Sequence, residues 1–246
     1  MLAIVEVISL KYVFVAHIRQ WYIIFAASVF LVIAALAGIM QPVLNQSAGS
    51  KPQPIFQGNG AKPQIAFACN VFWGEEFLPR MLDTLADNHI TITFFIGGSW
   101  AKRYPQILAD IAGRGHELAN HSYSHPHPNA LDKGKNKEQI VKTEQLVQEI
   151  TGMKTQLYAP PYGEYNDTVL MAADELGYKT IMWSIDTIDW QRPPADVIIN
   201  RVMKKVHNGA IILIHPTANT AEALPRLIQQ LQASGYQITS VSDILK

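Results

Sequence analysis

The sequence is poor in cysteine, in net charge and in glycine-rich motifs, and each of these absences excludes a class of protein. Its single cysteine, Cys69, can form neither an intrachain disulfide framework nor a thiolate zinc cluster. Lysine plus arginine and aspartate plus glutamate each number 20, so the formal net charge is zero and no basic stripe faces nucleic-acid phosphates. Neither a phosphate-binding glycine loop nor an internal repeat is visible. We therefore expect no nucleic-acid partner.

The longest uncharged stretch lies near the amino terminus, where residues 21–40 read WYIIFAASVFLVIAALAGIM. A helix needs about twenty apolar residues to cross a bilayer. Lys11 and Arg19 precede the stretch and the next positive charge is Lys51, so the positive-inside rule places the rest of the chain outside the cytoplasm. We expect an uncleaved, single-pass signal anchor. The alternatives are a signal peptide cleaved near residues 35–37, which would secrete the domain, and a buried core helix.

A linker and one domain follow the predicted anchor. Residues 41–63 are rich in Gln, Pro, Gly, Asn and Ser, a composition that buries too little apolar surface to fold. The remaining length is enough for one domain with a proper core. The predicted division is residues 1–20 as a cytoplasmic or membrane-proximal segment, 21–40 as a transmembrane anchor, 41–63 as a linker, and 64–246 as the domain.

From residue 64 onward, short apolar runs alternate with amphipathic stretches. The apolar runs predict buried strands at residues 64–69, 92–96, 117–120, 156–159, 180–183, 210–214 and 237–239. The amphipathic stretches predict helices at residues 76–88, 101–113, 137–151, 167–176, 194–206 and 221–233. This alternation implies an α/β fold with a parallel sheet and helical crossovers. About seven strands are too few for an eightfold barrel and favour a distorted, incomplete (β/α) barrel, with an open doubly wound sheet as the alternative.

Half of the eight histidines lie within residues 116–127. His121 and His125 are four positions apart, so both imidazoles can reach one metal ion from a helical turn or a tight loop. The zincin motif H-E-x-x-H is excluded, because His121 comes one position too late after His116 and Glu117. Alone, the pair would equally suit a polar loop bonded to backbone and water, so the metal interpretation depends on the rest of the chain.

Polar and aromatic residues follow five of the predicted strands, where a parallel α/β fold collects its chemistry. They occupy positions 70–75, 121 and 125, 159–165, 184–190, and 213–216. Each segment alone has a structural explanation, such as a turn, a helix cap or a satisfied core histidine. Five such segments on one rim of a sheet predict a functional site.

Four motifs within these segments carry a resemblance to a known family. They are His-Ser-x-x-His at 121–125, Pro-Pro-Tyr-Gly at 160–163, Asp-x-x-Asp-Trp at 186–190, and Leu-x-His at 213–215. Residues 64–246 resemble the polysaccharide deacetylases of the NodB homology domain, or carbohydrate esterase family four, which remove N-acetyl groups from chitin-like sugars and peptidoglycan. Residues 65–71 replace the family's first motif with a variant that looks like the sporulation-associated branch. The family fold, a distorted and incomplete β/α barrel, agrees with the strand pattern.

The resemblance implies a role for each motif residue. His121 and His125 would bind a divalent metal, usually zinc, that polarises the acetyl carbonyl and activates a water molecule. His215 would be the general acid, and Asp186 would orient it and favour its charged form. The substrate side of the site would comprise Tyr162 through its backbone N–H at the oxyanion, Pro161, Trp190 and Leu213.

Three positions depart from the family pattern. Asn70 stands where the catalytic base is expected, and an amide cannot accept the proton. Val71 replaces a metal-binding aspartate, and Ala159 replaces the arginine that holds the base. We interpret these as one linked change, because an arginine left without its carboxylate would be an unpaired buried charge. Metal would bind weakly unless Asn70, a water molecule, or a carboxylate such as Glu75 or Glu76 completes the site.

The predicted function is therefore a membrane-anchored, extracytoplasmic N-deacetylase of amino-sugar polymers such as peptidoglycan or chitin-like glycans. It would act by metal-assisted hydrolysis, impaired by the substitutions at positions 70, 71 and 159. The alternative is a catalytically inactive glycan-binding or scaffold protein. The retained histidines and Asp186 favour the enzyme, whereas the three substitutions favour the alternative.

Overall fold

The computed structural model describes residues 21, 25, 28–32 and 51–246. Residues Lys51–Lys246 form one compact unit. Among the described residues, no helix has both the length and the apolar character needed to cross a membrane. The predicted cytoplasmic segment at 1–20 and most of the predicted anchor at 21–40 lie outside the described residues.

The domain is built on one curled sheet of parallel strands, as the alternation predicts. The strands are β1 (Gln64–Val71), β2 (Thr93–Ile96), β3 (Glu117–Asn120), β4 (Leu157–Tyr158), β5 (Lys179–Thr180), β6 (Ile185–Asp186), β7 (Ile211–Ile214) and β8 (Gln237–Thr239). Their order is β5-β4-β3-β2-β1-β7-β6, and β8 pairs with the first residues of β1. This arrangement is the predicted incomplete barrel, and the short strand β6 is an element that the sequence pattern did not predict.

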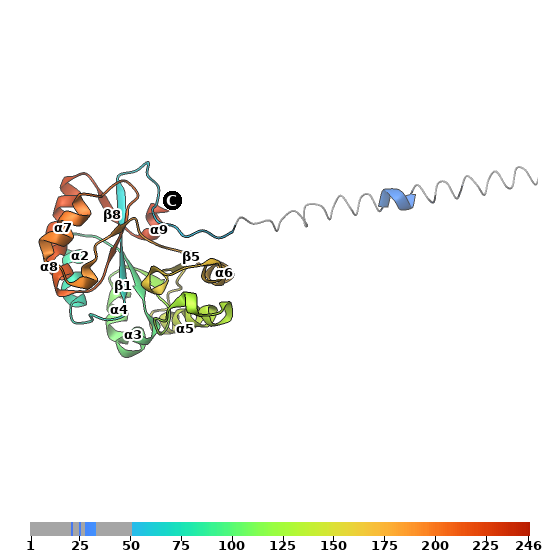
Figure 1. The fold of residues 1–246 in the computed structure, drawn as a ribbon, viewed down its shortest axis with the longest axis horizontal. Coiled ribbons are helices and arrows are strands. Elements are labelled where there is room, and N and C mark those ends of the chain that lie inside the picture. The colour runs from blue at the N-terminus through green and yellow to red at the C-terminus, as the bar shows by residue number, and fades with distance from the viewer. Residues whose placement is uncertain (1–20, 22–24, 26–27, 33–50) are drawn as a thin grey trace, which may run out of the picture. The chain divides into compact units, whose positions relative to one another are not determined.

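Helices follow the strands around the outside of the sheet (Figure 1). They are α2 (Leu78–Asp87), α3 (Gly98–Arg103), α4 (Pro105–Gly113), α5 (Lys133–Thr151), α6 (Asp167–Asp174), α7 (Ala195–Met203), α8 (Ala218–Ala233) and α9 (Val241–Ile244), with the 3-10 turns η2 (Pro128–Ala130), η3 (Pro161–Gly163) and η4 (Asp189–Gln191). The single helix predicted at 101–113 is wrong, because Tyr104 leaves the helical conformation (φ −127°, ψ 54°) and separates α3 from α4. The following Pro105 explains the break, since the residue before a proline avoids the helical region.

The two faces of β1 determine where the site lies. Side chains alternate along a strand, so Phe67, Cys69 and Val71 belong to the core cluster under the helices. Ala66 and Ala68 belong to the cluster inside the half-barrel, together with Phe95 of β2 and Ile211 of β7. Asn70 is two residues further along and faces the same inner side, at the carboxyl end of the strand.

Part of the predicted linker belongs to the domain. The backbone N–H of Ile55 donates to the carbonyl oxygen of Thr180 at 2.9 Å, and that of Gly58 donates to the carbonyl oxygen of Gly209 at 2.7 Å. Residues 55–58 therefore connect the end of β5 to the start of β7. The predicted domain start at residue 64 is too late, because backbone hydrogen bonds to sheet edges do not need an apolar sequence.

Candidate active site

A cavity of about 490 Å3 opens at the carboxyl ends of the strands and gathers most of the predicted site residues. It is lined by Asn70, Phe72, Trp73, His121, His125, Tyr162, Gly163, Trp183, Asp186, Trp190, Leu213 and His215. Cavities of this size, with mainly apolar walls and a few polar groups, are typical of small-molecule sites. Of the predicted substrate residues, Pro161 is the buried first residue of the η3 turn and does not line the cavity.

His121 and His125 face each other in the loop after β3, with ring centroids 4.9 Å apart. The Nδ1–H of His121 donates to the carbonyl oxygen of Ala159 at 2.8 Å, since a carbonyl can only accept, and Nε2 keeps its lone pair. Burial, followed by the neighbouring His125, lowers the pKa of His121 to about 3, and burial lowers the pKa of His125 to about 4. Both rings are therefore neutral near pH 7 and can act as ligands or as hydrogen-bonding groups.

The loop reaches this geometry through two residues with left-handed backbones, Ser122 (φ 63°) and His125 (φ 55°). The side chain of Asn120 stabilises the first turn, because its Oδ1 accepts from the N–H of Ser122 at 3.0 Å. The histidine pair is thus held by a tight loop and not by a helical turn, which was the other possibility left open by its spacing.

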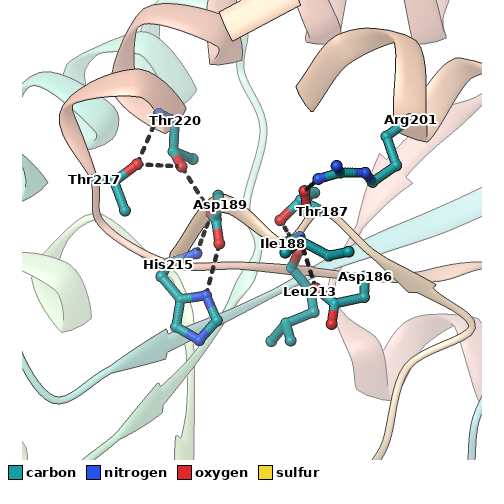
Figure 2. A network of polar contacts seen from close by, with 9 residues as sticks. All are labelled: Asp186, Thr187, Ile188, Asp189, Arg201, Leu213, His215, Thr217 and Thr220. Atoms are coloured by element: carbon teal, nitrogen blue, oxygen red, sulfur yellow. Dashed lines mark hydrogen bonds and ion pairs between the residues drawn. The ribbon is translucent and has the colours of Figure 1, made fainter. Parts of the chain in front are cut away.

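His215 follows β7 and is held by a buried aspartate, Asp189. The Nδ1–H of His215 donates to Asp189 Oδ1 at 2.7 Å, and its backbone N–H donates to Oδ2 at 2.6 Å. The hydroxyl of Thr220 donates to the same Oδ2 at 2.7 Å (Figure 2). Asp189 is fully buried, so these donors fix both the carboxylate and the ring, and Nε2 of His215 is directed to the cavity.

The prediction that Asp186 pairs with His215 is therefore wrong. Asp186 lines the cavity, but its Oδ1 accepts from the backbone N–H of Ile188 at 2.7 Å, and within the described part of the chain no hydrogen bond or ion pair joins it to His215 (Figure 2). Ile188 has a left-handed backbone (φ 52°), which turns the chain between the two aspartates. The second aspartate of Asp-x-x-Asp-Trp consequently reaches the histidine, and the first does not.

Aromatic rings form the two sides of the cavity. On one side, Trp73 stacks on His215 with an interplanar angle of 6° and centroids 5.7 Å apart. On the other, Tyr162 stacks on His127 with centroids 4.1 Å apart and meets His125 edge-on at 4.6 Å. Tyr162 has a left-handed backbone (φ 60°) and is 57% exposed, so its ring is available at the rim. Trp73 lies in the predicted rim segment 70–75, but no individual role was predicted for it.

Comparison with known proteins identifies the family of the chain. The family model for polysaccharide deacetylase matches residues 57–181, which is about half of the chain. The chain belongs to the polysaccharide deacetylase family. This agrees with the predicted resemblance and with the predicted reaction class, hydrolysis of the amide bond of N-acetyl groups, which is the family's chemistry.

The relatives at this level of similarity include an uncharacterized protein, a deacetylase and a pseudoenzyme. The chain is 43% identical over 195 residues to the uncharacterized protein YlxY of Bacillus subtilis, covering 79% of this chain and 61% of that protein. It is 32% identical over 196 residues to a peptidoglycan-N-acetylglucosamine deacetylase of Bacillus cereus, covering 78% and 71%. The crystal structure of BA3943, a CE4 family pseudoenzyme from Bacillus anthracis, has 39% identity and a TM-score of 0.78 over 79% of this chain and 69% of that one. A BA3943 mutant with restored enzymatic activity has 38% identity and the same TM-score over 79% of this chain and 72% of that one.

The residues of this chain do not fit a catalytic zinc with three protein ligands. Among the described residues, no three His, Cys, Asp or Glu side chains are clustered to hold a metal ion. Val71 points into the core cluster under the helices and is fully buried. Glu75, a possible replacement ligand, bonds through Oε1 to the hydroxyl of Tyr104 at 2.5 Å and does not line the cavity. Two imidazoles, those of His121 and His125, remain as possible metal ligands.

Asn70 and Ala159 occupy positions where the resemblance implies a base and an arginine. Asn70 lines the cavity and is 6% exposed, whereas Ala159 is 3% exposed and packs in the cluster inside the half-barrel. By the roles that the resemblance implies, His215 with Asp189 forms the intact half of the site, and positions 70, 71 and 159 form its substituted half.

Proposed function

We propose that the protein is a polysaccharide deacetylase-like protein that binds an N-acetylated amino-sugar polymer, such as peptidoglycan or a chitin-like glycan, and slowly hydrolyses the amide bonds of its N-acetyl groups. The observation that carries this proposal is the His215–Asp189 pair at the cavity, with hydrogen bonds of 2.6 and 2.7 Å. A histidine held by a fully buried carboxylate is an arrangement for proton transfer, and a purely structural loop has no need of it.

Each cavity residue has a specific role in this proposal. The sugar lies against Trp73 and Trp190, and the acetyl methyl group contacts Leu213 at the cavity wall. His215 donates the proton from Nε2 to the departing amine nitrogen, while Asp189 holds the ring through Nδ1. No residue at position 70 can remove a proton from the attacking water, because an amide is not basic. Slow turnover follows, since general base catalysis typically contributes about 10²–10⁴-fold in rate.

A second candidate is a glycan-binding protein without turnover. It is favoured by the joint substitution of the base, the metal aspartate and the arginine by Asn70, Val71 and Ala159. It is also favoured by the 39% identity to BA3943, a pseudoenzyme of the same family.

For either function, we propose that residues 21–40 anchor the protein in the membrane with the domain outside the cytoplasm, where a cell-wall polymer is accessible. The uncharged sequence of this segment and the positive charges before it support the proposal. Protease treatment of intact cells and of permeabilised cells tests it, because an extracytoplasmic domain is cleaved in both. Cleavage only after permeabilisation would contradict this orientation, and release of the domain into the medium would indicate the cleaved signal peptide.

Acetate release separates the two candidate functions. The purified full chain in mild detergent is incubated with chitooligosaccharides and with peptidoglycan, and its zinc content is measured in parallel. Slow acetate release that His215→Ala abolishes would support the enzyme. His207→Ala is the matched control, because His207 lies before β7, at the end opposite His215.

The combined variant Asn70→Asp, Val71→Asp and Ala159→Arg tests the substituted half of the site. Activity in this variant alone would support the non-hydrolysing candidate for the natural protein. Failure of both proteins to bind or cleave any of these polymers would contradict the proposed function.

A further inference from the structure

Asn70 has a buried amide side chain that has no hydrogen-bond partner among the described residues. It is 6% exposed and lines the cavity at the end of β1. Trp100 Nε1 is the one fully enclosed polar side-chain atom without a partner in the described chain, so the amide of Asn70 is reachable from the cavity. Because buried amides in proteins are almost always hydrogen-bonded, this one is placed to bond an occupant of the cavity.

His121 offers the complementary group in the same cavity. Its Nδ1–H is engaged by the carbonyl oxygen of Ala159 at 2.8 Å, which leaves Nε2 as an acceptor in the neutral ring. His121 is 2% exposed and follows β3, and its backbone N–H is bonded to the last residue of β2, Ile96, at 2.9 Å. A donor on β1 and an acceptor after β3 therefore converge on one apolar-walled space.

One donor and one acceptor are the complement of an amide. An acetamido group presents a carbonyl oxygen, which can accept from Nδ2 of Asn70, and an N–H, which can donate to Nε2 of His121. Its methyl group would contact the apolar wall at Leu213, which lines the same cavity. A deacetylated sugar presents an ammonium group with three donors and no acceptor, so it cannot satisfy Asn70 in this way.

We propose that Asn70 and His121 bind the N-acetyl group of an amino sugar directly, without a metal ion. The substitution of the base by asparagine is then a gain of recognition as well as a loss of catalysis. This inference rests on the proposed function, since it specifies which group of the glycan the cavity recognises.

Calorimetric titration of the metal-free full chain tests the proposal. The protein is treated with a chelator, freed of it, and titrated with N-acetylated chitotetraose and with the fully deacetylated glucosamine tetramer. We expect chitotetraose to bind without metal, about tenfold or more tighter than the deacetylated tetramer, and added zinc not to raise its affinity, because zinc would occupy Nε2 of His121.

Two variants at position 70 separate hydrogen bonding from shape. Asn70→Ala should weaken chitotetraose binding about tenfold, and the nearly isosteric Asn70→Asp at least as much, because a carboxylate cannot donate to the acetyl carbonyl. Asn200→Ala, on the exposed face of α7, is the matched control and should leave the affinity unchanged. Thermal unfolding confirms that each variant is folded.

The outcomes distinguish the inference from the proposed function. Three outcomes would overturn the inference without contradicting glycan binding. They are equal affinity for the two tetramers, chitotetraose binding that requires added zinc, and unchanged chitotetraose binding in folded Asn70→Asp. If wild-type protein bound neither tetramer nor peptidoglycan, with or without zinc, the proposed function would fail as well. The comparison of the two tetramers needs no variant, so a misfolded substitution does not remove the test.

Discussion

Replacing Asp189 should destabilise the domain far more than the same replacement at Asp186. Asp189 is fully buried and accepts three hydrogen bonds, from the backbone and ring of His215 and from the hydroxyl of Thr220, at 2.6 to 2.7 Å. Asp186 is partly exposed and accepts one, from the backbone of Ile188 at 2.7 Å. The two aspartates belong to one motif, so this comparison decides which of them is integral to the site.

The expected magnitudes follow from the number of donors that lose their acceptor. An unsatisfied buried donor costs about 1–3 kcal/mol. Asp189→Ala leaves two enclosed donors, the His215 N–H and the Thr220 hydroxyl, while the imidazole N–H of His215 can turn to water because its side chain is 15% exposed. We therefore expect a loss of roughly 3–5 kcal/mol in the free energy of unfolding. Asp189→Asn keeps one acceptor oxygen but directs an NH2 group at a donor, which should cost roughly 1–3 kcal/mol.

Asp186→Asn should cost less than about 1 kcal/mol, because the amide oxygen still accepts from Ile188. Urea unfolding of the full chain in mild detergent, followed by circular dichroism, measures each free energy. Equal losses for Asp189→Asn and Asp186→Asn, or a larger loss for Asp186→Asn, would refute the assignment of Asp189 as the residue that holds His215.

Two further substitutions test the buried histidine outside the site and the turn after β1. Burial lowers the pKa of His116 from 6.5 to about 4, so the unfolded chain binds the proton first and the stability of the fold decreases as the pH drops from about 6.5 to 4. His116→Asn should remove up to about 3 kcal/mol of this decrease, as measured by unfolding at a series of pH values. An unchanged slope of unfolding free energy against pH would contradict this expectation. The asparagine can still accept a hydrogen bond from the backbone N–H of Ile92, which donates to His116 Nδ1 at 3.2 Å. The wild type and the variant share all other histidines, so the difference between them reports His116. Gly74→Ala should cost at least about 1–3 kcal/mol in the free energy of unfolding and weaken chitotetraose binding, because Gly74 has φ 81° and an added Cβ would lie 2.0 Å from the carbonyl oxygen of Pro216. Thermal unfolding and binding assays measure both effects. In the same assays the control Gly113→Ala, whose added Cβ meets no atom within 4 Å, should be neutral.

The barrel could be predicted because its signals are local. The strands β1, β2 and β7 consist mainly of buried apolar residues, and their positions follow from the sequence alone. The two-residue strand β6 could not be predicted, because it is defined by pairing with β7 at Ile185–Ile212 and Asp186–Leu213 and not by its own composition. The segment around Ile55 was missed for the same reason, since its place depends on the sheet edges that it joins.

The spacing of residues in the sequence predicted part of the site but did not identify the aspartate that holds His215. Parallel strands bring their carboxyl ends to one rim, so the convergence of His121, His125 and His215 on one cavity followed from their positions after strands. The choice between Asp186 and Asp189 did not, because it depends on the left-handed backbone of Ile188, a residue type that rarely adopts this conformation. Tertiary contacts hold that turn, among them the Thr187 hydroxyl bonded to the Leu213 carbonyl oxygen at 2.7 Å.

The substituted half of the site is best understood as one coupled unit, and the coupling is measurable. Ala159 is 3% exposed inside the half-barrel, so Ala159→Arg alone should cost roughly 3–5 kcal/mol as an unpaired buried charge. If Arg at position 159 and Asp at position 70 form an ion pair, the double variant should be about 1–3 kcal/mol more stable to unfolding than the sum of the two single changes predicts. Unfolding free energies of the wild type, both single variants and the double variant give this interaction energy, and Asn70→Ala with Ala159→Arg is the control that should show none. Strict additivity in both pairs would mean that positions 70 and 159 changed independently, and that the missing arginine is unrelated to the missing base.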